Sequence, residues 1–258
     1  MADKVLRKVH GVKALLLKSM TGLTTNSVFA PDLLRSQSRF RRSVPVSLTK
    51  LTRWAYLNAG LTHLNLQVAV RVPPKKFTAI ACPRTIPLKR LILGSDAQPA
   101  SFLQQLFTAA KPTLIRLEVT VSPSTAPALV STFPIVAPSI TELSLSSSSA
   151  WHGRSTAAQP AFLGLLHLAT KVRWLGWEFE PLGYFKAITN ALPDQGARIE
   201  AISLVYIGFH QDQAFVRLVL DSGGLVNLRM VTVGPYSHLS KANKKACYER
   251  RVIFRQTD

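Results

Sequence analysis

The chain has 258 residues, 47% of them hydrophobic, so it can bury a sizeable core as one large domain or two small ones. Two cysteines, Cys82 and Cys247, exclude a disulfide framework and a cysteine metal cluster, which favours a reducing compartment, cytoplasmic or nuclear. The longest uncharged run, residues 119–141, contains four prolines, so we expect no membrane-spanning helix and no membrane partner. The apolar residues 14–17 are too few for a secretory signal, so we expect no export.

The net charge of +19 is unevenly distributed along the chain. Residues 1–60 hold 11 Lys or Arg against 2 acidic residues, and the last 18 residues hold 6 against 2. The long middle segment, residues 61–240, is milder, with 15 against 9. A basic end can bind nucleic acid or an acidic surface, or it can be a solvated segment that maintains solubility. We favour the solvated segment.

The pattern apolar-x-x-apolar-x-apolar recurs along the chain. Its seven clear copies are Leu61-Leu64-Leu66, Leu88-Leu91-Leu93, Leu114-Leu117-Val119, Ile140-Leu143-Leu145, Val172-Leu175-Trp177, Ile199-Ile202-Leu204 and Leu225-Leu228-Met230. Their starts are separated by 27, 26, 26, 32, 27 and 26 residues. A regular period of this length is typical of a repeat architecture. The longer interval indicates an insertion in the Ser-rich residues 146–154.

The N-terminal segment carries one degenerate copy, Val12-Leu15-Leu17, about two repeat lengths before Leu61. A strand should then begin near residue 36, where the sequence is instead basic and polar. Either a basic loop replaces a repeat there, or the segment, roughly residues 35–55, is not natural sequence, as after a misjoined reading frame. The predicted domains are a basic segment, residues 1–60, and a repeat domain with a C-terminal cap, residues 61–258.

Each copy predicts one strand, because its last two apolar residues alternate and therefore point to the same side. A Gly or Pro usually precedes the copy and ends the helix before it. Between the strands the apolar period lengthens to that of a helix. The helical stripes are Phe102, Leu103, Leu106, Phe107 and Ala110; Phe162, Leu165, Leu166 and Ala169; Phe185, Ile188 and Leu192; and Phe215, Leu218 and Val219.

Alternating strands and helices of this kind predict an α/β leucine-rich-repeat solenoid. In that horseshoe, parallel strands line the concave face and helices cover the convex face. Near the C-terminus, residues 241–250 are typical of a short basic helix, and residues 252–254 of a final strand. Such a unit would cap the last apolar face of the array.

Irregular repeats of about 26 residues, closed by residues 246–254, resemble those of fungal F-box and leucine-rich-repeat-like proteins. The resemblance covers residues 61–258. It implies that the repeats hold a target protein while an F-box docks on a linker subunit of a cullin-type ubiquitin ligase. Residues 1–60 do not match an F-box; residues 31–34, Pro-Asp-Leu-Leu, come nearest. We therefore predict that the chain by itself does not bind the linker subunit. A ligase role would then need an F-box lost from upstream or a separate adaptor.

No pattern for phosphate binding, dinucleotide binding or metal-dependent hydrolysis occurs in the sequence, and the six histidines are scattered. We therefore predict no enzyme, no catalytic residues, no cofactor, no metal and no small-molecule substrate. The expected activity is that of a protein–protein interaction scaffold, with substrate recognition for a ligase implied by the resemblance. The alternative is binding of nucleic acid or an acidic surface through the two basic ends.

The partner-binding residues are predicted from the strand alternation, which turns the residues beside the core positions toward the concave surface. They are His63, Asn65, Arg90, Arg116, Glu118, Glu142, Trp174, Glu178, Asn227 and Arg229. Three arginines and three glutamates balance there, which favours a protein partner over a nucleic acid. Trp174 is the candidate anchor, unless it packs against Trp177 or an adjacent repeat.

Overall fold

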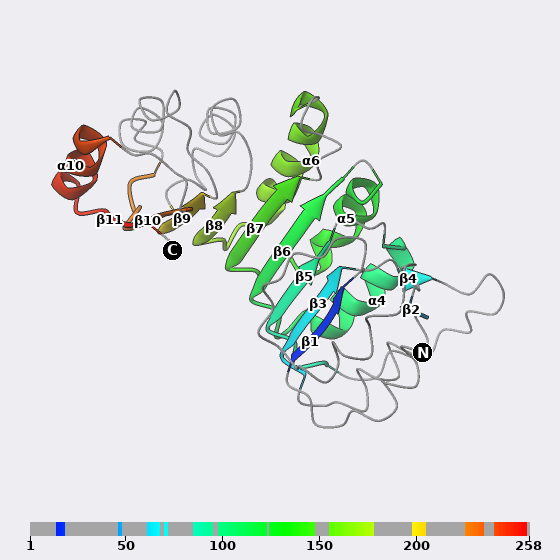
Figure 1. The fold of residues 1–258 in the computed structure, drawn as a ribbon. Coiled ribbons are helices and arrows are strands. Elements are labelled where there is room, and N and C mark those ends of the chain that lie inside the picture. Colours follow the sequence, from blue (N-terminus) through cyan, green and yellow to red (C-terminus); the bar gives the residue numbers. More distant parts are fainter. Residues whose placement is uncertain are drawn as a thin grey trace, which may run out of the picture.

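The computed structural model describes residues 14–18, 46–47, 61–67, 70–71, 85–94, 98–122, 124–147, 155–177, 198–204, 225–234 and 240–256. In these residues the chain forms a sheet of nine strands, every neighbouring pair parallel and in the order of the sequence (Figure 1). The strands are β1 (Ala14–Lys18), β3 (His63–Gln67), β5 (Arg90–Leu93), β6 (Arg116–Val121), β7 (Glu142–Ser147), β8 (Trp174–Trp177), β9 (Ala201–Leu204), β10 (Met230–Val233) and β11 (Ile253–Gln256). A separate parallel pair joins β2 (Val46–Ser47) to β4 (Val70–Arg71).

One face of each repeat strand forms the core. Along β6, burial alternates residue by residue, with Leu117, Val119 and Val121 buried and the residues between them half-buried. The strand register places Leu117 beside Leu91 on one side and Leu143 on the other. Each leucine of the pattern therefore stacks on the equivalent leucine of the next strand, and burial of this apolar layer supplies the main stabilisation of the fold.

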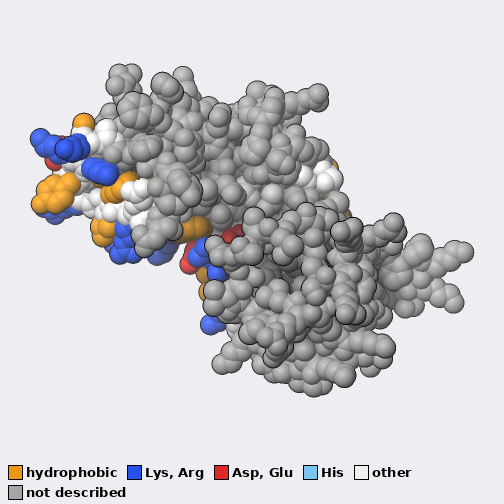
Figure 2. Space-filling model, in the orientation of Figure 1, with side chains coloured by type: hydrophobic (Ala, Val, Ile, Leu, Met, Phe, Trp, Pro, Cys, Tyr) orange, Lys and Arg blue, Asp and Glu red, His pale blue; other side chains and the backbone are white. Residues whose placement is uncertain are grey.

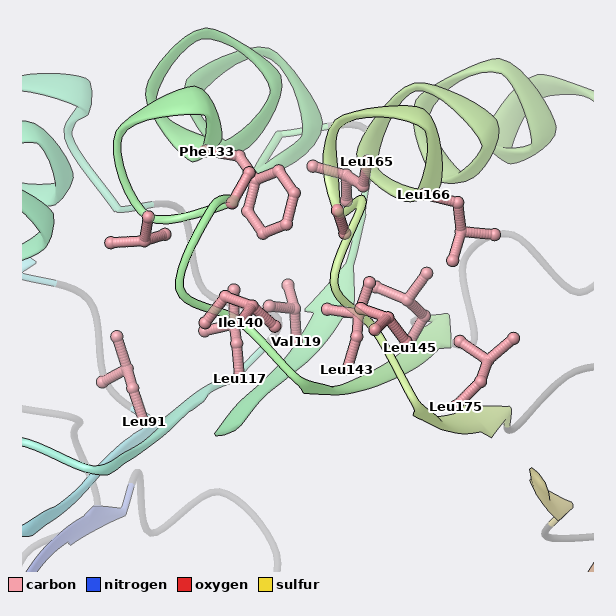
Figure 3. Packing of buried hydrophobic residues seen from close by; sticks show 14 of the residues in the cluster. Leu91, Leu117, Val119, Phe133, Ile140, Leu143, Leu145, Leu165, Leu166 and Leu175 are labelled. Atoms are coloured by element: carbon pink, nitrogen blue, oxygen red, sulfur yellow. The ribbon is translucent and has the colours of Figure 1, made fainter. Parts of the chain in front are cut away.

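Helices cover this apolar face of the sheet. They are α4 (Ala100–Ala110), α5 (Ala126–Thr132), α6 (Ser155–Leu168) and the terminal α10 (Lys241–Glu249), with a 3₁₀ turn η1 (Phe133–Ile135) after α5. Figure 3 shows Phe133 on the helical side above Ile140 and Val119, and Leu165 and Leu166 above Leu143 and Leu145. The predicted stripe of α4 is buried throughout, as is the stripe Phe162, Leu165, Leu166 and Ala169 in and after α6.

The strands begin with the same main-chain hydrogen bonds at six successive junctions. At each junction, a carbonyl two positions before a buried leucine or isoleucine accepts hydrogen bonds from two consecutive N–H groups where the following strand begins, at 2.7–3.1 Å. Between β5 and β6, for example, the Lys89 carbonyl accepts from Ile115 and Arg116. The accepting carbonyls belong to Thr62, Lys89, Ile115, Thr141, Arg173 and Glu200. These bonds satisfy polar backbone groups that a turn against the core could otherwise leave unpaired.

The structure confirms a parallel α/β sheet whose strands follow sequence order. It also confirms a strand at the degenerate N-terminal copy, since Leu15 and Leu17 of β1 align with Leu64 and Leu66 of β3. Because β1 pairs directly with β3, the chain between them inserts no strand there. The terminal helix is confirmed as α10, and the final strand follows it as β11. The two remaining predicted stripes, residues 185–192 and 215–219, lie outside the described residues.

One prediction needs correction, and one helix was not predicted. The last copy of the pattern is Leu228-Val231-Val233 and not Leu225-Leu228-Met230, because Val231 aligns with Ile202 and Val233 with Leu204. Both triplets fit the pattern, and Leu225 is itself buried in the preceding turn, so the sequence is ambiguous at this point. The proline-containing run also holds a helix that the pattern did not predict. Pro127 lies in the first turn of α5, where a missing N–H costs no helical hydrogen bond.

Replacement of Leu117 by alanine should lower the free energy of unfolding by about 2–5 kcal/mol, because the side chain is fully buried between two strands and a cavity would remain. The matched control is Ile115→Ala, two residues earlier, where the side chain is 41% exposed. Its cost should stay below about 1 kcal/mol. Urea denaturation followed by circular dichroism measures both, and equal losses would contradict the assigned strand register.

Candidate protein-binding face

The side chains on the sheet face opposite the buried leucines form what we call the strand face. Two aligned rows make it up. The first row is His63, Arg90, Arg116, Glu142, Trp174, Ala201, Met230 and Ile253, and the second is Asn65, Ile92, Glu118, Ser144, Gly176, Ser203, Thr232 and Arg255. Positions in one row belong to neighbouring strands, which lie about 4.8 Å apart. Residues separated by 23 or more positions in the sequence are thereby neighbours on this face.

Glu118 of β6 joins two arginines on this face. Its Oε1 lies 2.6 Å from a terminal nitrogen of Arg90 and accepts a hydrogen bond from Arg116 Nε at 2.8 Å. Arg116 also reaches the next strand, where its Nη1 donates to Glu142 Oε2 at 3.1 Å. All four side chains retain between 22% and 39% of their exposure, so the ion pairs form a network accessible to solvent.

Arg116 extends this network onto an aromatic ring. Its guanidinium carbon lies 4.6 Å from the centroid of the Trp174 ring, within the range of a cation–π interaction. The ring also lies along its own strand: a Cβ at Gly176 would come within 2.8 Å of the Trp174 ring and 2.6 Å of Ser144 Oγ. Because Gly176 has no side chain, the indole ring of Trp174 can occupy this space. Trp174 is half-buried, and its ring already packs against Arg116 of another repeat within the same chain.

The network is electrically balanced and is flanked by neutral polar groups. Two arginines and two glutamates lie between β5 and β7, and the second row continues with Ser144, Ser203 and Thr232. Such a surface offers paired donors and acceptors together with one aromatic ring. A surface of this kind complements a partner that presents both charge signs, whereas a polyanion would meet no excess of positive charge.

Most of the predicted partner-binding residues are on this face. His63, Arg90, Arg116, Glu142 and Trp174 share the first row, and Asn65 and Glu118 share the second. His63 is exposed at the start of β3, where its Nδ1 lies 2.8 Å from Thr62 Oγ1.

Three predicted residues are not placed on the strand face. Asn227 and Arg229 lie in the turn before β10, because the register of that strand differs from the predicted one by three residues. Met230 and Thr232 take the two strand-face positions instead, and the overlapping triplet Leu228-Val231-Val233 was the signal for them. Glu178 lies outside the described residues. Gly176 was also missed, since its role depends on the position of a ring that the sequence does not give.

The described residues contain no group of three or more His, Cys, Asp or Glu side chains arranged to hold a metal ion. The described cysteine, Cys247 in α10, is buried, and this burial raises the pKa of its thiol. The thiol is therefore protonated at neutral pH and packs as a small apolar group. Within the part of the chain that the structure covers, no helix combines the length and apolar character needed to cross a bilayer.

Comparison with known proteins gives no family-model match, no match among curated proteins and no match among solved structures. The function must therefore be inferred from the geometry of the strand face.

Replacement of Glu118 by glutamine should lower the free energy of unfolding by up to about 1 kcal/mol, because the carboxylate is shared by two partly screened guanidinium groups. The control is Glu249→Gln, which removes only an exposed pair with Lys245 at 3.6 Å. Urea titrations in low salt and in 0.5 M NaCl would compare them. The Glu118 effect should shrink in high salt because salt screens the pairs; an effect no larger than the control's would contradict the network.

Proposed function

We propose that the chain is a leucine-rich-repeat solenoid that binds another protein through the strand face. The observation that carries this proposal is that charged side chains lie partly exposed on one face of an all-parallel sheet while the other face holds the core. Parallel sheets in globular α/β proteins are almost always covered on both faces. A solenoid is the architecture in which helices cover one face and the strand face stays open for a partner.

The repeated turn supports the solenoid. The same paired hydrogen bonds occur at six junctions, so one structural unit is added again and again along the sheet. Contacts also run between neighbours: α4 packs on α5, α5 packs on α6, and each strand of the main sheet pairs with the next. Nearest-neighbour stacking of this kind is what distinguishes a repeat array from a fold with one central core.

The composition of the strand face supports a protein partner. Trp174 is pre-positioned by Arg116, so a partner that covers it pays little side-chain entropy for ordering the ring. Tryptophan and arginine are also the residue types that most often dominate the energy of protein interfaces. With the ion pairs balanced, a target surface carrying alternating charges fits this face better than a run of phosphates.

The resemblance to F-box and leucine-rich-repeat-like proteins makes the target of a ubiquitin ligase the first class of partner to test. The basic-end alternative, binding of nucleic acid or an acidic surface, rests on residues 1–60 and on the C-terminal unit. In the first of these segments the structure describes only β1 and β2. The described C-terminal unit exposes Lys241, Lys244 and Lys245 on α10, which supports electrostatic attraction there.

Replacement of Trp174 by alanine, or of Glu142 by lysine, should reduce recovery of the specific partner at least tenfold, because each change removes a strand-face anchor or reverses its charge. The measurement is affinity purification with quantitative mass spectrometry, followed by titration with the purified partner. Tyr248→Ala and Glu249→Lys are matched controls, since both residues are exposed on α10. Partners retained by both strand-face variants would contradict binding at this face.

The isolated chain should not bind the linker subunit of a cullin-type ligase, because residues 1–60 lack the sequence of an F-box. Size-exclusion chromatography of the purified chain mixed with linker subunit and cullin tests this directly. We expect separate elution, with a fusion of an F-box to the same chain as the positive control. Co-elution of the unfused chain would show that a docking segment exists without the F-box pattern.

A further inference from the structure

The turns that lead from each helix into the next strand lie along one edge of the sheet, because the strands are parallel. We call this edge the entry rim. Its basic residues are Lys89, Lys111, Lys171, Arg173, Arg198, Arg229, Arg250 and Arg251, and all are exposed. Among the described turn residues, Glu200 is the acidic one. The sheet therefore has a basic edge at the strand starts, next to a strand face on which the charges balance.

Apolar side chains are exposed on the same rim. Ile115 is 41% exposed and Val226 is 69% exposed in the turns, and Ile253 is 54% exposed where β11 begins. Leu168 adds a fourth exposed side chain at the end of α6. Figure 2 shows hydrophobic and basic side chains, with acidic side chains among them, along the margin where β7 to β11 begin in Figure 1. At the opposite edge, Gly94, Ser122 and Thr125 carry no charge, whereas Lys18 ends β1.

Helix stability explains part of this pattern. Lys111 and Arg250 follow directly after α4 and α10, and Lys171 lies three residues after the end of α6, where a positive charge interacts favourably with the helix dipole. Lys89 and Arg173 have a different position, immediately before the strands, among the turn residues whose carbonyls accept the paired hydrogen bonds. Arg229 has the equivalent position before β10, where its carbonyl accepts one hydrogen bond from Ile253. Arg173 forms an ion pair with Glu200 at 3.6 Å. Because both side chains are exposed, this ion pair is weak and leaves the guanidinium group accessible to a partner.

We propose that the entry rim binds an acidic, extended segment of a partner protein that also carries apolar side chains. Lys89 and Arg229 are five strand-to-strand steps apart, roughly 24 Å at about 4.8 Å a step. An extended peptide covers that length with about seven residues. Carboxylates of such a segment would meet Lys89, Arg173 and Arg229, and its apolar side chains would cover Ile115 and Val226.

The apolar side chains favour a protein segment over a nucleic acid. A single-stranded nucleic acid binds through basic groups interleaved with aromatic rings on which its bases stack. The exposed apolar residues of the described turns, Ile115 and Val226, are aliphatic, and the exposed aromatic residue Tyr248 lies on α10 outside the turns. Ile253 belongs to both the rim and the strand face, but the proposed rim contacts do not use it, so this inference does not depend on the proposed function.

The test uses the full chain and a fluorescent twelve-residue peptide in which glutamate and leucine alternate. Fluorescence anisotropy in low salt measures its binding to the wild type, to Lys89→Glu/Arg229→Glu on the rim, and to Lys241→Glu/Lys245→Glu on α10. The two variants carry the same net charge, and circular dichroism checks that each is folded. Val226→Ser tests the apolar contribution against an all-glutamate peptide of equal length.

We expect the rim variant to bind the glutamate–leucine peptide about tenfold more weakly, with little change in the α10 variant. Val226→Ser should weaken binding of that peptide and leave the all-glutamate peptide unaffected. Equal weakening in both charge variants would indicate attraction by net charge alone and overturn the proposal. The proposal would also be overturned if the wild type did not bind the peptide. It would be overturned as well if the wild type bound a single-stranded oligonucleotide more tightly and the rim variant lost that binding, or if sedimentation showed self-association that depends on the rim.

Discussion

The repeated main-chain hydrogen bonds at the strand entries are the constraint on which the rest of this structure depends. At each of six junctions one carbonyl accepts from two consecutive N–H groups of the next repeat. This arrangement fixes where the next strand begins relative to the last one, to within a single residue. Because side chains alternate along a strand, a shift of one residue would turn every leucine of a repeat toward solvent.

Three surfaces of the molecule follow from that fixed register. The leucines of successive strands stack into one buried layer, which α4, α5 and α6 cover. The residues between them align into the strand face, where Arg90, Glu118 and Glu142 come within reach of their partners across strands. The turn residues align into the entry rim. The same geometry thus separates an apolar layer, a balanced polar face and a basic edge.

The sequence predicted the buried layer well because the signal for it is local. Each leucine triplet is enough to predict its own strand, and the spacing of the apolar residues in α4 is enough to predict that helix. The prediction was wrong where two local patterns overlapped, at residues 225–233, and it did not include the short, proline-containing helix α5. Only the pairing with Ile202 and Leu204 decides between the overlapping triplets, and that pairing is not a local property.

The candidate surfaces were less predictable because they depend on contacts between repeats. The sequence identified the charged residues of the strand face but not that Glu118 would bridge Arg90 and Arg116. The position of the Trp174 ring requires both Gly176 and an arginine two strands away. The entry rim was missed altogether, since its basic residues are spread over more than 160 positions, from Lys89 to Arg251, and the middle of the chain is only mildly basic.

Site-specific photo-crosslinking tests the central claim, that the open strand face is where a protein partner binds. A photoreactive amino acid at Ser203, a half-buried strand-face position in β9, would be compared with one at Val130, which is exposed on α5 at the helical side. The account predicts a discrete crosslinked partner from Ser203 that Trp174→Ala abolishes, and none from Val130. A partner captured from Val130 and absent from Ser203 would contradict it and place the binding surface on the helices.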